Sequence, residues 1–110
     1  MIGEFERQLK RGMLDIIILK RLNDRPAHGY ELLLEIKKSS QVFSSLKEGT
    51  LYPRLYRLLD EKCIVCTPEL SEDGTKIKKV YKITLLGREQ LQILLKVWMR
   101  FVDDMNQVLR

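Results

Sequence analysis

Few side chains in this chain of 110 residues could carry out covalent or metal chemistry. There is one histidine, His28, and there are two cysteines, Cys63 and Cys66, spaced as C-x-x-C. This set is too small for a Cys/His zinc site within one chain. No Ser/His/Asp arrangement, carboxylate pair or glycine-rich phosphate loop stands out, so the sequence predicts no enzyme, no cofactor and no metal site.

The C-x-x-C pair leaves two interpretations open. The thiols of Cys63 and Cys66 could form a redox switch near a strand edge. However, the pair follows no helix N-terminus, and an extended strand places residues i and i+3 on opposite faces. The preferred interpretation is a pair of small buried hydrophobic side chains. By the same reasoning, His28 is interpreted as a turn or capping residue rather than a ligand.

Positive charge is the second feature with chemical consequences. The chain carries 20 Lys and Arg against 15 Asp and Glu, a net charge of +5. Residues 74–82 hold four lysines and no acid, and these are Lys76, Lys78, Lys79 and Lys82. A short basic stretch on a nearly neutral body indicates contact with a polyanion, and the alternative is a solvated hairpin.

Composition bounds the class of protein. Hydrophobic residues make up 45% of the chain and charged residues 32%, which is typical of a single globular domain. No apolar run reaches the roughly 18 residues of a membrane span, and the N-terminus lacks the pattern of a signal peptide. We therefore expect a cytoplasmic protein without membrane contact.

The hydrophobic pattern predicts the elements that position these residues. Helices are expected over residues 5–22, 29–38, 48–62 and 86–109, with Thr84 capping the last one. Strands are expected over 64–67 and 80–83, joined by a loop with an Asp-Gly turn signal. Pro53 is tolerated in the third helix only in its first turn, which predicts a start near Gly49 or Thr50. The predicted fold class is α+β and mostly helical.

The last helix carries an apolar seam with the 3, 4, 3, 4, 3 spacing of a heptad repeat. So broad a face on a terminal helix predicts a dimer, because the helix over residues 5–22 also has apolar surface to cover. The alternative is that the last helix folds back on its own domain. The residues predicted at the dimer interface are Leu9, Met13, Ile17, Leu91, Leu94, Trp98, Phe101, Val102, Met105 and Val108.

The order of elements predicts a winged helix-turn-helix. The second and third helices form the helix-turn-helix, and the hairpin after them forms the wing. The early residues of the third helix are expected at base edges and phosphates in the major groove of double-stranded DNA, with the wing lysines at the flanking backbone or minor groove. The predicted DNA-binding residues are Lys47, Thr50, Tyr52, Pro53, Tyr56, Arg57, Lys76, Lys78 and Lys79.

Three motifs, in order, resemble those of PadR-type transcriptional regulators. The P-A-H-G-Y-E-L of residues 26–32 is similar to the family's P-x-H-G-Y-E-L segment. The E-G-T-L-Y-P of residues 48–53, with Leu55, Arg57 and Leu58, resembles its recognition helix. The K-V-Y-K-I-T of residues 79–84, with Gly87, resembles the junction into its last helix.

The resemblance implies a homodimeric winged-helix repressor of the short subfamily, which has a single C-terminal helix and includes multidrug-responsive regulators. It further implies a flat apolar effector bound between protomers against Trp98, with Met13, Ile16, Leu94 and Phe101 nearby. The alternative is that Trp98 is an interface core residue without a ligand.

Two departures from the family pattern stand out. The family's left-handed glycine after the recognition helix is replaced by Cys63, and the wing has lysines in place of a Gly-Gly-Arg tip, which favours phosphate contact.

Tyr30 is assigned to the core.

The predicted organisation is a winged-helix DNA-binding domain over residues 1–84 and a dimerisation helix over residues 85–110. The predicted function is that of a DNA-binding transcriptional regulator. Two alternatives stay open from the residues alone. One is a protein-interaction module without specific DNA binding, and the other is a thiol-responsive regulator acting through Cys63 and Cys66.

Overall fold

Seven elements follow one another along residues 2–110, the part of the chain that the computed structural model describes. They are α1 (Ile2–Asp24), β1 (Ala27–His28), α2 (Gly29–Ser39), α3 (Glu48–Asp60), β2 (Ile64–Leu70), β3 (Ile77–Ile83) and α4 (Leu85–Val108). The predicted mostly helical α+β class with a winged helix-turn-helix is confirmed. The two-residue strand β1 was not predicted, and both wing strands extend three residues further toward the tip than predicted.

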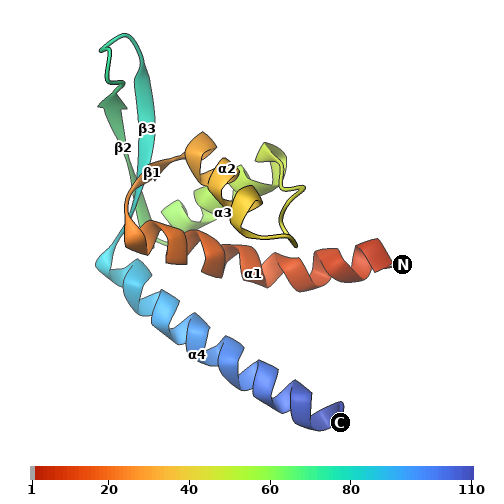
Figure 1. Cartoon of the computed structure of the whole chain (residues 1–110). Coiled ribbons are helices and arrows are strands. Elements are labelled where there is room, and N and C mark those ends of the chain that lie inside the picture. The colour runs from red at the N-terminus through yellow and green to blue at the C-terminus, as the bar shows by residue number, and fades with distance from the viewer. Residues whose placement is uncertain (1) are drawn as a thin grey trace.

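The hydrophobic core lies where the first three helices meet the base of the sheet (Figure 1). Ile18 of α1, Leu32 of α2 and Leu51 of α3 are fully buried there. The apolar stripe of α3 faces this core, because Leu55 and Leu58 are buried with Leu51. The apolar spacing of α3 therefore determines which of its sides is left for solvent.

Two ion pairs fix α1 against the helix-turn-helix. The Arg54 guanidinium of α3 donates Nε and Nη2 to the Asp15 carboxylate at 2.7 and 2.5 Å. The Arg21 guanidinium donates to Glu35 of α2, and this bond lowers the pKa of the Glu35 carboxyl. Both carboxylates lie partly buried between helices, where a paired charge holds neighbouring elements in one orientation.

The sheet is antiparallel in the order β1-β3-β2, which makes β2 an edge strand. Pro68 lies in β2, where an edge position tolerates a residue without an N–H group. Cys66 pairs with Tyr81 near the buried base, and Leu70 pairs with Ile77 at the far end. The hairpin of β2 and β3 projects beyond the helices as a wing (Figure 1).

The wing tip is closed by hydrogen bonds around Asp73. Its carboxylate accepts bonds from the hydroxyls of Ser71 and Thr75 and from the Thr75 N–H, at 2.6, 2.7 and 3.0 Å. These bonds lower the pKa of Asp73 to about 2. Gly74 takes a positive φ of 73°, which a residue without a side chain adopts at no steric cost.

The start of α3 differs from the prediction. Lys47 occupies the N-cap and Glu48 is the first helical residue, so Pro53 lies in the second turn rather than the first. A proline there leaves the carbonyl of Gly49 without its helical partner. Pro53 is nevertheless accommodated because it lies on the exposed side of the helix.

The predicted left-handed residue after α3 is also corrected. Lys62, with φ of 63°, takes this conformation, and Cys63 does not. Cys63 is already turning into the sheet, since its N–H donates to the Leu58 carbonyl at 3.0 Å and Ile64 begins β2. The sequence motif therefore placed the unusual backbone one residue too late.

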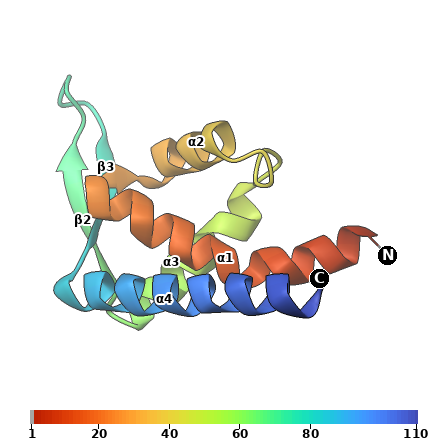
Figure 2. The same ribbon diagram turned by 60° about the horizontal axis from the view of Figure 1, so that its bottom comes forward.

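The last helix begins at a polar joint with the end of α3. The Thr84 hydroxyl caps α4 as predicted, accepting from the Gly87 N–H at 3.0 Å. The same hydroxyl donates to the carbonyls of Lys62 and Cys63, at 2.7 and 3.0 Å. Beyond its first turns, α4 runs away from the wing on the same side as the N-terminal half of α1 (Figure 2).

Half of the predicted seam on α4 is exposed in the single chain. Leu91 is an exception, because it is only 1% exposed and belongs to the core of its own chain. Leu94 is half-buried, whereas Phe101 and Val108 are exposed. Within residues 2–110, no helix is both long and apolar enough to span a membrane.

Candidate nucleic-acid interface

One side of α3 is free of tertiary contacts. The helix buries Leu51, Leu55 and Leu58, which turns the opposite side outward. This outward side carries exposed polar, aromatic and small residues, namely Lys47 at the N-cap, Gly49, Thr50, Pro53, Tyr56 and Arg57. Five of the six residues predicted to contact DNA from this helix therefore lie on its exposed side.

Tyr52, the sixth, is half-buried because it packs over the start of α2. A Cβ atom on Gly29 would collide with the Tyr52 hydroxyl, so any larger residue here requires the tyrosine ring to shift. His28 caps α2 as predicted, with Nδ1 accepting from the Glu31 N–H at 3.3 Å.

A hollow of about 430 Å³ separates α3 from the wing. It gathers all four tyrosines of the chain with two wing lysines, and its lining includes Tyr30, Tyr52, Tyr56, Tyr81, Lys78 and Lys79. The rings of Tyr52 and Tyr56 lie 6.2 Å apart. Burial raises the pKa of Tyr81 to about 12, so its hydroxyl stays protonated at physiological pH. Hydroxyl and ammonium donors at one groove are suited to phosphate oxygens.

Tyr30 corrects the sequence analysis, which assigned it to the core. Its side chain is 56% exposed and lines the hollow beside the α3 tyrosines. A signal for the exposure of Tyr30 was present in the sequence, since Tyr30 directly follows Gly29, the glycine on which Tyr52 packs. It could not be used because the packing of Tyr52 on Gly29 is a contact between two helices that the sequence does not define.

The charges of the interface are less one-sided than the lysine run indicated. Arg57 donates to Glu61 at 2.9 Å on the helix surface. In the wing, Lys78 is the cross-strand partner of Glu69, which also lies 3.5 Å from Lys82. The antiparallel pairing brings Glu69, the one acid of β2, beside two lysines of β3, and a count along the sequence does not show this neutralisation.

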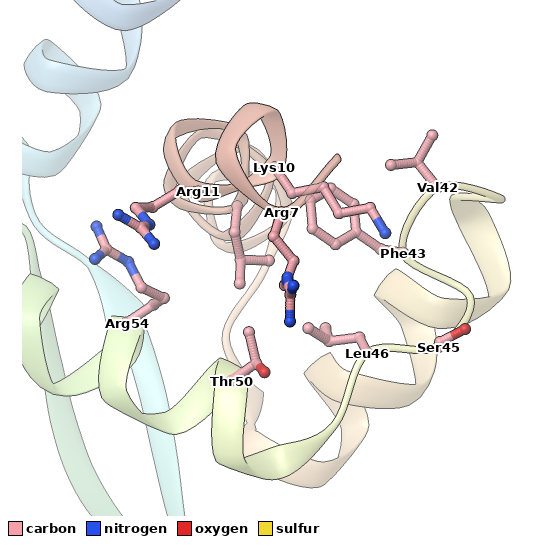
Figure 3. A pocket seen from close by; sticks show the side chains of 10 residues that line it. Arg7, Lys10, Arg11, Val42, Phe43, Ser45, Leu46, Thr50 and Arg54 are labelled. Carbon is pink, nitrogen blue, oxygen red and sulfur yellow. The ribbon is translucent and has the colours of Figure 1, made fainter. Parts of the chain in front are cut away.

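A second hollow, of about 450 Å³, lies on the other flank of α3 (Figure 3). Leu14, Phe43 and Leu46 form its buried apolar floor. Basic side chains surround it, three from α1 and one from α3, and they are Arg7, Lys10, Arg11 and Arg54. The three on α1 were not predicted as a contact surface, although their i, i+3, i+4 spacing indicates one helix face.

The two cysteines lie behind α3. Cys63 is buried, and burial raises the pKa of its thiol, which keeps it protonated and a poor nucleophile. Cys66 is half-buried opposite Tyr81. These surroundings support the interpretation of Cys63 as a small hydrophobic side chain.

The residues predicted to bind an effector are spread over α1 and α4. Met13, Ile16 and Leu94 are half-buried against the core. Trp98 is 37% exposed and Phe101 is 54% exposed on α4. The aromatic side chains therefore present surface that the single chain does not cover.

An outward-facing recognition helix, a helix that supports it and a projecting two-stranded wing define a winged-helix DNA-binding protein. Comparison with known proteins narrows this class. Residues 18–93 match the model of the "Transcriptional regulator PadR-like family". The chain belongs to the PadR-like family of transcriptional regulators, and it is a DNA-binding regulator rather than an enzyme.

Individual relatives agree with this assignment. The chain is 38% identical over 88 residues to an uncharacterized protein of Lysinibacillus sphaericus, covering 80% of each. A PadR-like transcriptional regulator from Bacillus cereus has a similar structure, with a TM-score of 0.82 at 33% identity over 94% of this chain and 97% of that one. A transcriptional regulator from Clostridium thermocellum gives a TM-score of 0.83 at 27% identity, over 94% of this chain and 99% of that one.

Proposed function

We propose that the chain acts as a homodimeric repressor, which binds operator DNA in the cytoplasm through α3 and the wing of each copy. The observation that carries this proposal is the exposed side of α3 beside the tyrosine-lined hollow. One copy offers a small contact set, so useful affinity requires two half-sites read by two copies. The uncovered apolar side of α4 supplies a surface on which the copies can pair.

The DNA contact is tested on the DNA upstream of the protein's own gene. Fluorescence anisotropy at several salt concentrations should show sequence-preferring binding that weakens steeply with salt. Arg57→Ala and Lys47→Ala should each weaken binding roughly tenfold, because each removes a donor from the exposed side of α3. Lys38→Ala, which removes the same charge at the far end of α2, should leave affinity nearly unchanged. Equal binding to operator and scrambled DNA would refute the proposal.

We propose further that a flat apolar effector binds against Trp98 and releases the DNA. The partly exposed Trp98, with the exposed Phe101 one turn further along α4, supports this proposal. Such a ligand shifts the regulator only if it binds two dimer arrangements unequally. Trp98 is the only tryptophan, so its fluorescence reports binding directly. Planar dyes that leave both the emission and the operator affinity unchanged would show that Trp98 is an ordinary interface residue.

A further inference from the structure

The second hollow, between the N-terminal half of α1 and α3, combines an apolar floor with a basic rim (Figure 3). Its volume is about 450 Å³, and most of the surface that lines it is apolar. Among the described residues, four cations border it and no aspartate or glutamate does. A recess with this composition disfavours cationic ligands, and it offers an anion both charge and apolar contact.

The chain neutralises only part of this rim. Arg54 is already paired across the helices, and Lys10 lies 3.7 Å from Glu6, one turn earlier on α1. Along residues 2–110, neither Arg7 nor Arg11 forms an ion pair. The two lie four residues apart, so they are neighbours on one helix face. Two adjacent unpaired guanidinium groups are suited to a carboxylate, since their planar geometry matches both of its oxygens.

The basic side chains lie directly beside the apolar ones. Arg7 reaches from α1 toward Leu46 and Thr50, which line the opposite wall of the hollow (Figure 3). The Lys10 ammonium lies 5.8 Å from the centre of the Phe43 ring. A ligand whose charged group binds at the rim can therefore place its apolar part on the floor within the same site.

The floor is held in place by the chain itself. The Phe43 N–H donates to the Ser40 hydroxyl at 3.2 Å, and the Leu46 N–H donates to the Phe43 carbonyl at 3.0 Å. Both side chains, together with Leu14, also belong to the hydrophobic core. A site that is formed before its ligand arrives costs little ordering on binding, so a small molecule can bind it with useful affinity.

Two simpler ligands would match only half of the hollow. A DNA phosphate would bind the cations but leave the apolar floor unmatched, and an uncharged apolar molecule would leave the arginines without an anion. We propose that the hollow binds an amphipathic anion, of the class of medium-chain aliphatic carboxylates. Its carboxylate lies at Arg7 and Arg11, and its alkyl chain lies over Phe43 and Leu46. Trp98 does not line the hollow, so this site is separate from the effector surface proposed on α4.

Thr50 connects the hollow to the DNA-binding side of α3. It lines the hollow and also lies on the exposed side of the helix. An anion bound here adds negative charge beside that side, within about 8 Å, the screening distance at physiological ionic strength. Operator affinity should therefore fall when the hollow is occupied. This consequence rests on the proposed DNA binding, whereas the ligand site itself does not.

The ligand class is tested by isothermal titration calorimetry with sodium decanoate below its micelle concentration. Decanoate should bind the full chain, and octanoate should bind about tenfold more weakly because it buries two fewer methylene groups. Decyltrimethylammonium has the same alkyl chain with the opposite charge and should show no binding. Equal binding of the two decyl compounds would overturn the inference, as would displacement of decanoate by an equal concentration of inorganic phosphate.

Variants test the location of the site. Arg7→Gln with Arg11→Gln should weaken decanoate binding about tenfold, because it removes both unpaired guanidinium groups. Lys37→Gln with Lys38→Gln removes the same charge from α2, outside the hollow, and should bind like the parent.

Two further results would overturn the assignment to this hollow. One is loss of decanoate binding in Trp98→Phe, which would place the anion on α4 instead. The other is a change in sedimentation of the arginine double variant without ligand, which would show that a second copy covers the hollow.

Fluorescence anisotropy tests the consequence for DNA. Saturating decanoate should weaken operator binding of the parent about fivefold and leave that of the arginine double variant unchanged. Operator binding by the parent that decanoate does not alter would overturn the coupling through Thr50. If the parent binds no operator at all, the proposed function fails, and calorimetry still decides whether the hollow binds the carboxylate.

Discussion

At the scale of single residues, two glycines determine how closely the elements approach. Gly29 makes room for the Tyr52 hydroxyl at the start of α2. Gly87 lies against the backbone carbonyl of Cys63, where the end of α3 meets α4. A tyrosine side chain can rotate away from an added methyl group, but the backbone carbonyl of Cys63, which accepts from the Thr84 N–H at 3.0 Å, cannot. The two positions therefore differ in the cost of a substitution.

Gly87→Ala is expected to destabilise the fold by about 1–3 kcal/mol, because the new methyl group forces Thr84 and the carbonyl of Cys63 apart. Gly12→Ala is the control, since a Cβ atom there meets nothing within 4 Å. The control should be neutral or stabilising by up to about 1 kcal/mol, as alanine is the better helix former. Urea denaturation measures both values. A Gly87→Ala variant as stable as the Gly12→Ala variant would contradict the close approach.

Single residues were predictable where a local motif defines them. Thr84 and His28 were identified as caps because capping depends on the next three residues alone. Tyr30 was missed because its exposure depends on how α2 meets α3 and the wing. The left-handed conformation was assigned to Cys63 instead of Lys62 because the motif locates the turn but not its register.

At the scale of elements, α1 and α3 are joined by one bidentate ion pair. Asp15 lies within the most apolar stretch of α1, where a carboxylate without a partner would be costly to bury. Arg54 lies on the flank of α3, between the buried leucines and the outward side. The pair therefore sets the rotation of the recognition helix about its own axis.

Asp15→Asn should destabilise the chain by about 1–3 kcal/mol, because it leaves the Arg54 guanidinium partly buried without its charged partner. Combining it with Arg54→Met should recover part of this loss, since no unpaired charge then remains. A double-mutant cycle in urea gives the coupling energy of the pair. A coupling indistinguishable from zero would show that the bond does not hold the helices together.

Element order and type were largely predictable, because all four helices and two of the three strands are marked by their apolar residues. The length of the wing was not, since its outer halves leave the core and lose the burial that creates a pattern. Pro68 and Glu69 also have low β-propensity, so hydrogen bonding between the strands extends the hairpin where residue preference does not. The neutralisation of the wing lysines follows from the same pairing.

At the scale of the whole molecule, the main apolar surface that the single chain leaves exposed lies along one side of α4. Val97, Phe101 and Val108 expose apolar surface there. Phe5 and Leu9 expose apolar surface on the N-terminal half of α1, which diverges from α4 in Figure 1. Isolated exposed apolar residues are ordinary, but a row of them along one helix is typical of an interface.

Phe101→Glu is expected to weaken self-association at least tenfold, since a charge would have to be buried without a partner. Sedimentation velocity at micromolar concentration should then show monomers, and operator affinity should fall with it. Leu34→Glu introduces the same charge on the exposed side of α2 and should leave both unchanged. A parent protein that sediments only as a monomer would refute the proposed dimer.

The joint at Thr84 has a mechanical consequence. The Thr84 hydroxyl links the carbonyls of Lys62 and Cys63, just after α3, to the Gly87 N–H in the first turn of α4. The close approach of Gly87 to the Cys63 carbonyl leaves no room for movement beside it. If α4 tilts about this point, α3 and its exposed side must move with it, because the connection at Thr84 is too rigid to bend. In a dimer held together by the terminal helix of each copy, a few degrees of tilt would therefore change the distance between the two recognition helices, and with it the spacing of the major grooves that they can enter together.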